Sequence, residues 1–137
     1  MARLGLVVAD FNRSVTAEME DAALSAAASR DADVVDVTSV PGAYDSPLAA
    51  DRLARRDDVD AVAVVGAIVT GDTNHDEVIG NAIAQKLTDV SLERDTPVTL
   101  GVTGPGMSGA EARERVENAA HAVDGALDLV AELGDDS

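Results

Sequence analysis

The chain has 137 residues, with 26 Asp or Glu against 10 Lys or Arg and a formal net charge of -16. Its hydrophobic share of 46% is enough for one folded domain over 1–137, which excludes general disorder. The absence of cysteine excludes disulfides and thiolate chemistry, and the strong negative charge excludes a basic nucleic-acid interface.

The charge also bears on where the protein works. Most acidic residues are Asp, and Lys86 is the only lysine. Self-repulsion would destabilise such a chain in dilute salt, whereas at ~1 M salt the Debye length falls to ~3 Å. The composition therefore predicts a protein of a high-salt cell, with an ordinary acidic protein as the alternative. No apolar run suits a membrane span, and MARLGLVVADFN lacks the plan of a signal peptide, so we expect a cytoplasmic protein.

Apolar runs and helical patterns alternate along the first half of the chain. Residues 4–9 are continuously apolar, which predicts a strand covered on both faces. Residues 14–30 keep apolar side chains on one side of a predicted helix. A second strand is expected at 34–40. Ser46 and Pro47 then fit the N-cap and the first position of a second helix.

The second half continues the alternation. We expect a strand at 61–66, a loop at 66–75, a helix at about 76–92, a strand at 97–102, a turn at 104–106 and a long helix at 108–133. Ser108 and Glu111 match a capping box at the start of that last helix. Right-handed crossovers place helices on both faces of a parallel sheet. The pattern therefore predicts an α/β fold with three layers (α/β/α) and a doubly wound, four-stranded parallel sheet.

Three unusual side chains follow the predicted strands. Phe11 and Tyr44, the only aromatic residues, come just after the first and second strands, and His75 lies in the loop after the third. Ligands of open parallel sheets bind beyond the carboxyl ends of the strands. There a phenyl ring can stack on a flat heterocycle, and an imidazole can transfer protons. The alternatives are that the rings plug the end of the sheet and that the histidine is merely solvated.

Further candidates are polar or cationic. Asp45 can accept hydrogen bonds from hydroxyl groups, or it is only the residue before a helix cap. The loop with Gly71, Asp72 and Thr73 enters a helix amino end, which is a plausible cradle for phosphate. Arg115 follows Glu111 by four residues, so it is either half of an exposed ion pair or a guanidinium fork for phosphate.

In this order and spacing, four motifs resemble the 6,7-dimethyl-8-ribityllumazine synthase family. They are Phe11-Asn12, VPGAYDSP (40–47), GAIVTGDTNH (66–75) and the acidic-Arg pair at 114–115. The resemblance extends from Leu4 to about Leu133 and implies a flavodoxin-like fold. It also implies a transferase of riboflavin biosynthesis, which joins 5-amino-6-(D-ribitylamino)uracil to 3,4-dihydroxy-2-butanone 4-phosphate and releases phosphate and two waters. Neither a cofactor nor a metal is implied.

The resemblance assigns substrate contacts to particular positions. They are Phe11 for stacking on the pyrimidine, Ala43, Tyr44 and Asp45 for the ribityl chain, backbone at Ile68 and Val69 for the uracil edge, Gly71, Asp72, Thr73 and Arg115 for the phosphate, and Leu100 for covering the pocket. His75 would move protons during imine formation and phosphate elimination. Asp45 stands where the family usually has Glu, and Leu100 where it has a phenylalanine from the neighbouring subunit. The family's lysine in the last helix has no counterpart.

The resemblance also implies a homo-oligomer. In the family the site lies between adjacent subunits of a pentamer, so Leu100 and Arg115 would reach into a neighbour's pocket. A lone pentamer, a pair of pentamers and a 60-subunit shell all remain open. Two other functions also remain open: an archaeal-type riboflavin synthase of the same fold, and a non-catalytic shell protein that binds flavin or lumazine.

Overall fold

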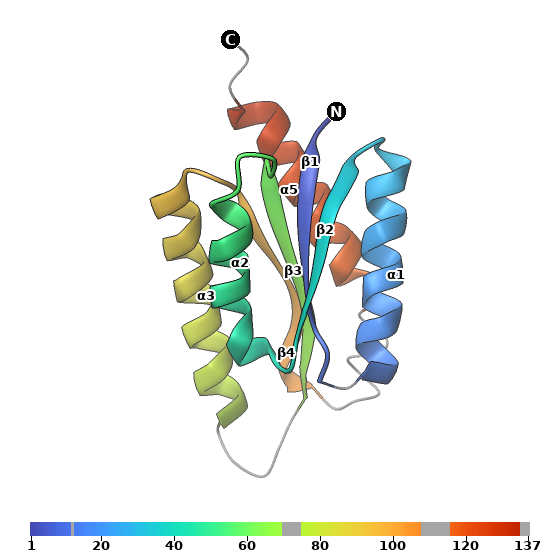
Figure 1. Ribbon diagram of the computed structural model, residues 1–137. Coiled ribbons are helices and arrows are strands. Elements are labelled where there is room, and N and C mark those ends of the chain that lie inside the picture. Colours follow the sequence, from blue (N-terminus) through green and yellow to red (C-terminus); the bar gives the residue numbers. More distant parts are fainter. Residues whose placement is uncertain (12, 70–74, 108–115, 135–137) are drawn as a thin grey trace.

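The computed structural model describes residues 1–11, 13–69, 75–107 and 116–134. Strands and helices alternate along the described chain (Figure 1). The elements are β1 (Arg3–Ala9), α1 (Arg13–Ser29), β2 (Asp33–Val40), a short 3-10 helix η1 (Ala43–Asp45), α2 (Ser46–Ala54), β3 (Ala61–Val69), α3 (His75–Arg94), β4 (Val98–Met107) and α5 (Asn118–Leu133). The predicted alternation of strand and helix is confirmed.

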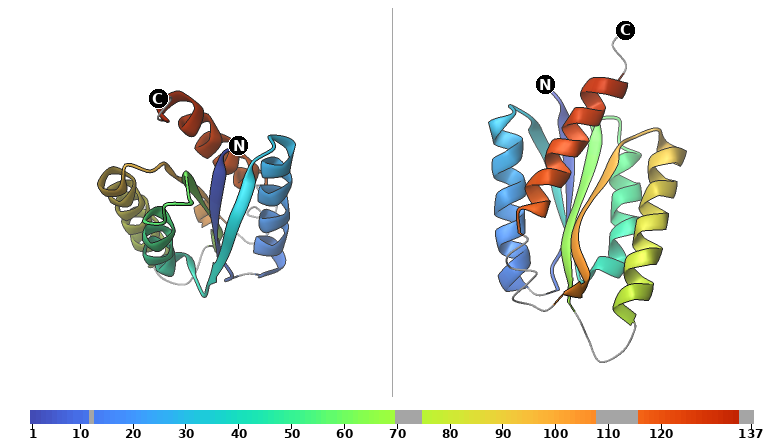
Figure 2. Two further views of the ribbon diagram at one scale, coloured as in Figure 1. Left: turned by 45° about the horizontal axis from the view of Figure 1, so that its top comes forward. Right: turned by 180° about the vertical axis from the view of Figure 1, so that it is seen from behind.

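The strands form one parallel sheet in the order β2-β1-β3-β4. Helices α1 and α5 cover one face, and α2 and α3 cover the other (Figures 1 and 2). The predicted doubly wound α/β fold with three layers is therefore confirmed. All strands end at the same edge of the sheet, the lower edge in Figure 1, which we call the carboxyl edge; the opposite edge is the amino edge.

Successive strand residues supply two separate apolar cores. On one face Leu6 and Val8 pack with α1 and α5, and on the other face Val7 packs with α2 and α3. Period-two alternation of side chains in a strand explains this division. Because both faces are covered, β3 and β1 from Leu4 onward are apolar without interruption, as expected for buried parallel strands.

A glycine sets the approach of α5 to the sheet. A Cβ atom added at Gly101 of β4 would lie 2.8 Å from Ala122 Cβ and 3.0 Å from the carbonyl oxygen of Asn118. Beside it, the Thr99 hydroxyl donates a hydrogen bond of 2.6 Å to the Ala122 carbonyl. Only a residue without a side chain fits between the strand and the first turns of α5.

Several predicted boundaries are wrong. The strand predicted at 61–66 continues to Val69, so the loop predicted from residue 66 begins later. The turn predicted at 104–106 lies inside β4, which continues to Met107 after a register shift. A Gly-Pro-Gly run is tolerated there because an edge strand pairs on one side only.

The start of the last helix also differs from the prediction. Residues 116–117 form a turn, and α5 begins at Asn118, near the residues that pack against Gly101. A continuous helix over 108–133 is therefore wrong. Ser108 and Glu111, the predicted capping box, lie outside the described residues. No helix in the described ranges is long and apolar enough to cross a membrane.

Candidate functional site

The carboxyl edge carries the candidate residues because the four strands run in parallel. Phe11 follows β1, Tyr44 lies in η1 directly after β2, and His75 is the first residue of α3. The short helix η1 contacts both α3 and β3, so the segments after the strands meet at one edge of the sheet. This arrangement confirms that the aromatic residues lie beyond the ends of the first two strands.

The two rings at this edge face solvent. Phe11 is 61% exposed and Tyr44 is 70% exposed, so neither ring plugs the end of the sheet. Ala43, next to Tyr44, is instead buried in the core beneath α2 and α3. The side chain of Ala43 therefore anchors η1, while Tyr44 remains available for a ligand. Rings that are exposed at the end of a rigid sheet are suited to bind a planar molecule.

Asp45 has a structural role in η1. Its Oδ2 atom accepts a hydrogen bond of 3.1 Å from the backbone N–H of Gly42, and its own N–H donates to the Gly42 carbonyl at 3.0 Å. Ser46 is the first residue of α2 and not its N-cap, because Asp45 holds the N-cap position and the Ser46 hydroxyl donates to the Ala43 carbonyl at 2.7 Å. Asp45 Oδ1 has no partner in the described part of the chain, so it can accept a ligand hydroxyl.

Leu100 lies apart from the rings. It pairs with Val64 in the middle of β3, several residues before the carboxyl edge. Its side chain is 44% exposed on the outer strand of the sheet. Within one protomer the structure therefore brings Phe11, Tyr44 and Asp45 to one edge but leaves Leu100 on the flank.

Other predicted positions lie beyond what the structure describes. Asn12, Gly71, Asp72, Thr73 and Arg115 are outside the described residues. The structure describes only the backbone of Ile68, Val69 and His75. That backbone places Ile68 and Val69 at the end of β3.

An ion-pair network beside Phe11 was not predicted. Arg13 Nη1 lies 3.0 Å from Asp10 Oδ1 and 3.1 Å from Glu20 Oε1. The hydrogen bond to Glu20 is the main cause that raises the pKa of Arg13. The only signal in the sequence was an acidic residue three positions before a basic one at the start of a helix, a common surface pattern.

The remaining cations of the described residues are mostly paired far from this edge. Every arginine in the described ranges except Arg52 has an acidic partner. Apart from Arg13, these pairs lie at or toward the amino edge; an example is Arg3, whose guanidinium is 3.1 Å from Asp60. Arg52 itself is in the last turn of α2, which begins at the carboxyl edge and runs away from it.

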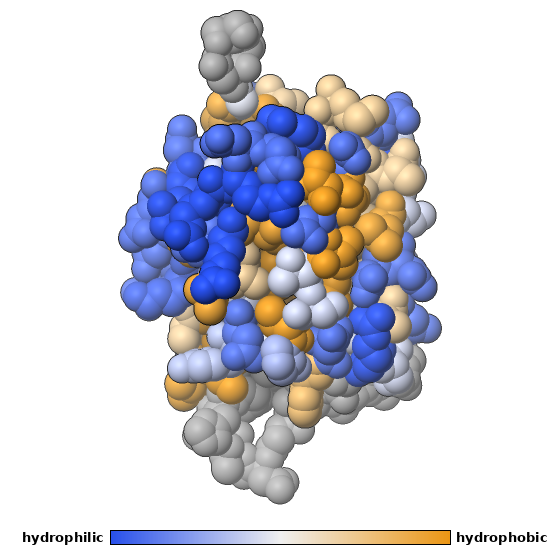
Figure 3. All heavy atoms as spheres, in the orientation of Figure 1, coloured by the Kyte–Doolittle hydropathy of each residue, from blue (hydrophilic) through white to orange (hydrophobic). Residues whose placement is uncertain are grey.

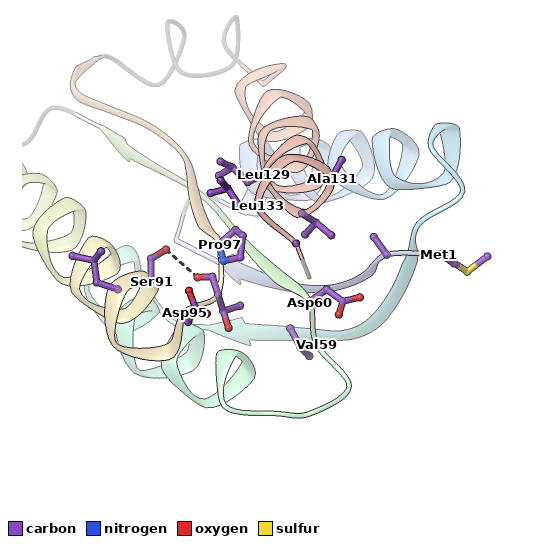
Figure 4. A pocket seen from close by; sticks show the side chains of 14 residues that line it. Met1, Val59, Asp60, Ser91, Asp95, Pro97, Leu129, Ala131 and Leu133 are labelled. Carbon is purple, nitrogen blue, oxygen red and sulfur yellow. Dashed lines mark hydrogen bonds between the residues drawn. The ribbon is translucent and has the colours of Figure 1, made fainter. Parts of the chain in front are cut away.

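A cavity lies at the amino edge, opposite the rings. Its volume is about 890 Å³, and its lining includes Met1, Asp60, Pro97, Leu129 and Leu133 (Figure 4). The Ser91 hydroxyl donates to the Thr96 carbonyl at 2.9 Å beside it.

Comparison with known proteins gives one family. The family model described as 6,7-dimethyl-8-ribityllumazine synthase matches residues 1–133. A curated relative from Halobacterium salinarum with that name is 74% identical over 133 residues, covering 97% of this chain and 100% of the relative. One from Halorubrum lacusprofundi with the same name is 72% identical over 133 residues, covering 97% and 99%.

More distant relatives carry the same name. One from Methanosarcina barkeri is 47% identical over 130 residues, covering 95% of this chain and 97% of the relative. The identity is thus much higher to the two haloarchaeal proteins than to the protein from M. barkeri. This difference agrees with the high-salt origin that the composition predicts.

Proposed function

We propose an enzymatic function from one premise: the chain belongs to the 6,7-dimethyl-8-ribityllumazine synthase family. It condenses 5-amino-6-(D-ribitylamino)uracil with 3,4-dihydroxy-2-butanone 4-phosphate. The products are 6,7-dimethyl-8-ribityllumazine, phosphate and two waters. The observation that carries the proposal, beside the family match, is the pair of exposed rings at the carboxyl edge. The proposal treats 1–137 as one functional domain.

The reaction makes modest demands on the protein. An amine condenses with a ketone to an imine, phosphate is eliminated, and ring closure releases the second water. No electrons are exchanged with an outside reagent, so the steps as written need no redox cofactor. Holding two substrates in reacting geometry supplies most of the acceleration, and the remaining steps are proton transfers, which we assign to His75.

Each substrate has proposed contacts. Phe11 stacks on the pyrimidine, and the Oδ1 atom of Asp45, which has no partner among the described residues, accepts a ribityl hydroxyl. The assignment of Asp45 is supported by its geometry, since Oδ2 already closes the turn with Gly42. We assign the other contacts by position as follows: Ala43 and Tyr44 along the ribityl chain, Ile68 and Val69 at the uracil edge, and Gly71, Asp72, Thr73 and Arg115 at the phosphate.

The charge distribution supports a dedicated cation for the phosphate. A protein of net charge -16 repels an anionic substrate unless a local positive group offsets the field. The arginines of the described residues do not offer one, because their guanidinium groups are paired with acids or, for Arg52, lie away from the carboxyl edge. Two further arginines, Arg113 and Arg115, lie outside the described residues, and we assign the phosphate to Arg115 by its position in the family motif.

The surface of α3 supports assembly from copies of this chain. Between residues 78 and 88 the only charged side chain is Lys86, although 26% of all residues are charged. Val78 is 63% exposed on this helix, and Leu92 is 76% exposed farther along it. Figure 3 shows hydrophilic residues over the amino-edge part of α2 and α3 and hydrophobic residues lower on the same side.

A helix segment with a single charged residue is unusual on so acidic a surface and fits a contact between subunits. We therefore propose a pentamer-based homo-oligomer with sites between subunits, in which Leu100 covers a neighbour's pocket. We also place the reaction in the cytoplasm, because a phosphorylated substrate does not cross a bilayer unaided.

The test is a reaction with both substrates in molar KCl, followed by lumazine absorbance and released phosphate. We expect product well above the spontaneous rate. H75N should lower kcat, whereas H121N should not, because His121 is exposed on α5 and has no proposed contact with either substrate. A rate equal to the spontaneous one rejects the proposal. Riboflavin formed from lumazine alone would instead indicate a riboflavin synthase, and lumazine binding without turnover a shell protein.

A further inference from the structure

We propose that Arg13 is a positioning residue, which braces the turn carrying Phe11 between the end of β1 and the body of α1. The inference rests on the proposed function, because it concerns the ring that stacks on the pyrimidine. It assigns to Arg13 an effect on one substrate only.

The backbone before Phe11 is fixed on the side of β2. β1 ends at Ala9, and the next residue, Asp10, donates its N–H to the carbonyl oxygen of Val40 at 2.8 Å. Val40 is the last residue of β2. This bond ties the first residue of the turn to the neighbouring strand, so the turn begins from a rigid point.

Arg13 fixes the same turn on the side of the helix. It is the first residue of α1, and its Nη1 atom donates hydrogen bonds to Asp10 Oδ1 and to Glu20 Oε1. Glu20 lies two turns into the helix, and its side chain is only 23% exposed. The guanidinium therefore links the carboxylate of Asp10 to a well-packed part of α1, and Phe11 lies between the two linked residues.

The network is suited to positioning and poorly suited to binding phosphate. Two carboxylates share one guanidinium, so the local charge of the group is negative and a phosphate would be repelled. Phe11 itself is 61% exposed, so core packing does not fix the direction of its ring. That direction depends on the backbone of the turn, which the brace holds.

Arg30 provides a matched control. It follows the other end of α1 and also bridges two acids, with Nη2 2.8 Å from Asp128 and Nη1 3.6 Å from Asp124. This second network lies toward the amino edge, away from Phe11. Replacing either arginine removes a comparable exposed network, but only the one at Arg13 adjoins the proposed site.

The experiment compares R13M and R30M in steady-state kinetics with each substrate varied in turn, at one KCl concentration. R13M should raise KM for ribitylaminouracil by about two- to tenfold, with kcat and KM for butanone phosphate nearly unchanged. R30M should change neither KM, and it should lower Tm about as much as R13M does. R13K should recover part of the effect, since an ammonium group retains one ion pair.

A cycle with F11L separates this inference from the proposed function. F11L should raise the same KM, and F11L/R13M should be no worse than F11L alone. If F11L raises that KM and R13M does not differ from R30M, the brace is wrong and the stacking role stands. If F11L has no effect on that KM, both the stacking role of Phe11 and the positioning role of Arg13 are wrong. A rise in KM for butanone phosphate with R13M would make Arg13 a phosphate ligand and overturn the inference.

Discussion

At the amino edge, arginines tie separate elements together: Arg56 lies 2.7 Å from Asp36 of β2, and Arg94 lies 2.8 Å from Asp51 of α2. At the carboxyl edge, the two aromatic rings are exposed, and Arg13 makes the only ion pairs found there in the described residues. Among the described residues, most ion pairs that join separate elements therefore lie toward the amino edge, whereas the exposed rings lie at the carboxyl edge. We infer that stability is concentrated where no chemistry is expected.

The largest effect should come from removing the arginine assigned to the phosphate and comparing the result with the same substitution at the amino edge. R115A should raise KM for butanone phosphate about ten- to a hundredfold, because it removes a charge-assisted contact to phosphate, and it should leave Tm nearly unchanged. R56A at the amino edge should do the reverse, lowering Tm with unchanged kinetics. Steady-state kinetics and thermal unfolding of both variants test this. An R115A enzyme with wild-type KM would remove the phosphate assignment.

A substitution at Gly101 should show that α5 packs against β4 only when the two backbones approach closely. G101A should destabilise the protein by about 1–3 kcal/mol, since the added Cβ would overpack against Ala122 and the Asn118 carbonyl. G125A is the control, because its Cβ would meet only Thr99 Cγ2 at 3.8 Å. G125A should be neutral or slightly stabilising, as Ala favours a helix over Gly. Chemical unfolding measures both, and equal stability of the two variants would contradict the packing argument.

Salt should stabilise the whole molecule. The net charge of -16 repels itself at low ionic strength, and screening removes most of this repulsion at ~1 M salt. Tm should therefore rise with KCl up to molar concentration. A series in KCl followed by circular dichroism tests the expectation, and a Tm that does not respond would indicate an ordinary acidic protein.

Acid should weaken the amino edge. Hydrogen bonds from Arg3 lower the pKa of Asp60, and those from Arg94 lower the pKa of Asp51. A lowered folded pKa means that the stabilisation is complete above the unfolded value of about 3.9 and is lost as pH falls through the folded pKa.

Urea midpoints between pH 6 and pH 3 test this effect, which should be the smallest because these groups are largely solvated. D60N should start less stable than wild type and lose less stability on acidification. D57N, whose carboxylate has no ion pair within the described ranges, should keep the wild-type slope. A D60N profile parallel to that of wild type would contradict the assignment.

Much of the fold was predictable because the signals are local. Continuous apolar runs marked β1 and β3, and the position of Phe11 and Tyr44 after the first two predicted strands indicated the edge that bears the candidate site. The resemblance of the motifs to a known family indicated the reaction, which the spacing of strands and helices alone does not define.

The wrong predictions depend on neighbours that are distant in the sequence. The Gly-Pro-Gly run is typical of a turn, and it lies in a strand because β4 is at the edge of the sheet. The start of α5 depends on where Ala122 meets Gly101. The contact between Arg13 and Glu20 joins residues seven apart, and the sequence does not show which acid a long side chain selects.

The proline within β4 bears on how the protein avoids aggregation. In molar salt, charge repulsion between molecules is weak, so it protects exposed sheet edges poorly. Pro105 has no amide hydrogen and cannot donate to a strand added along this edge. It therefore interrupts the ladder of backbone hydrogen bonds that a fibril would need along this edge.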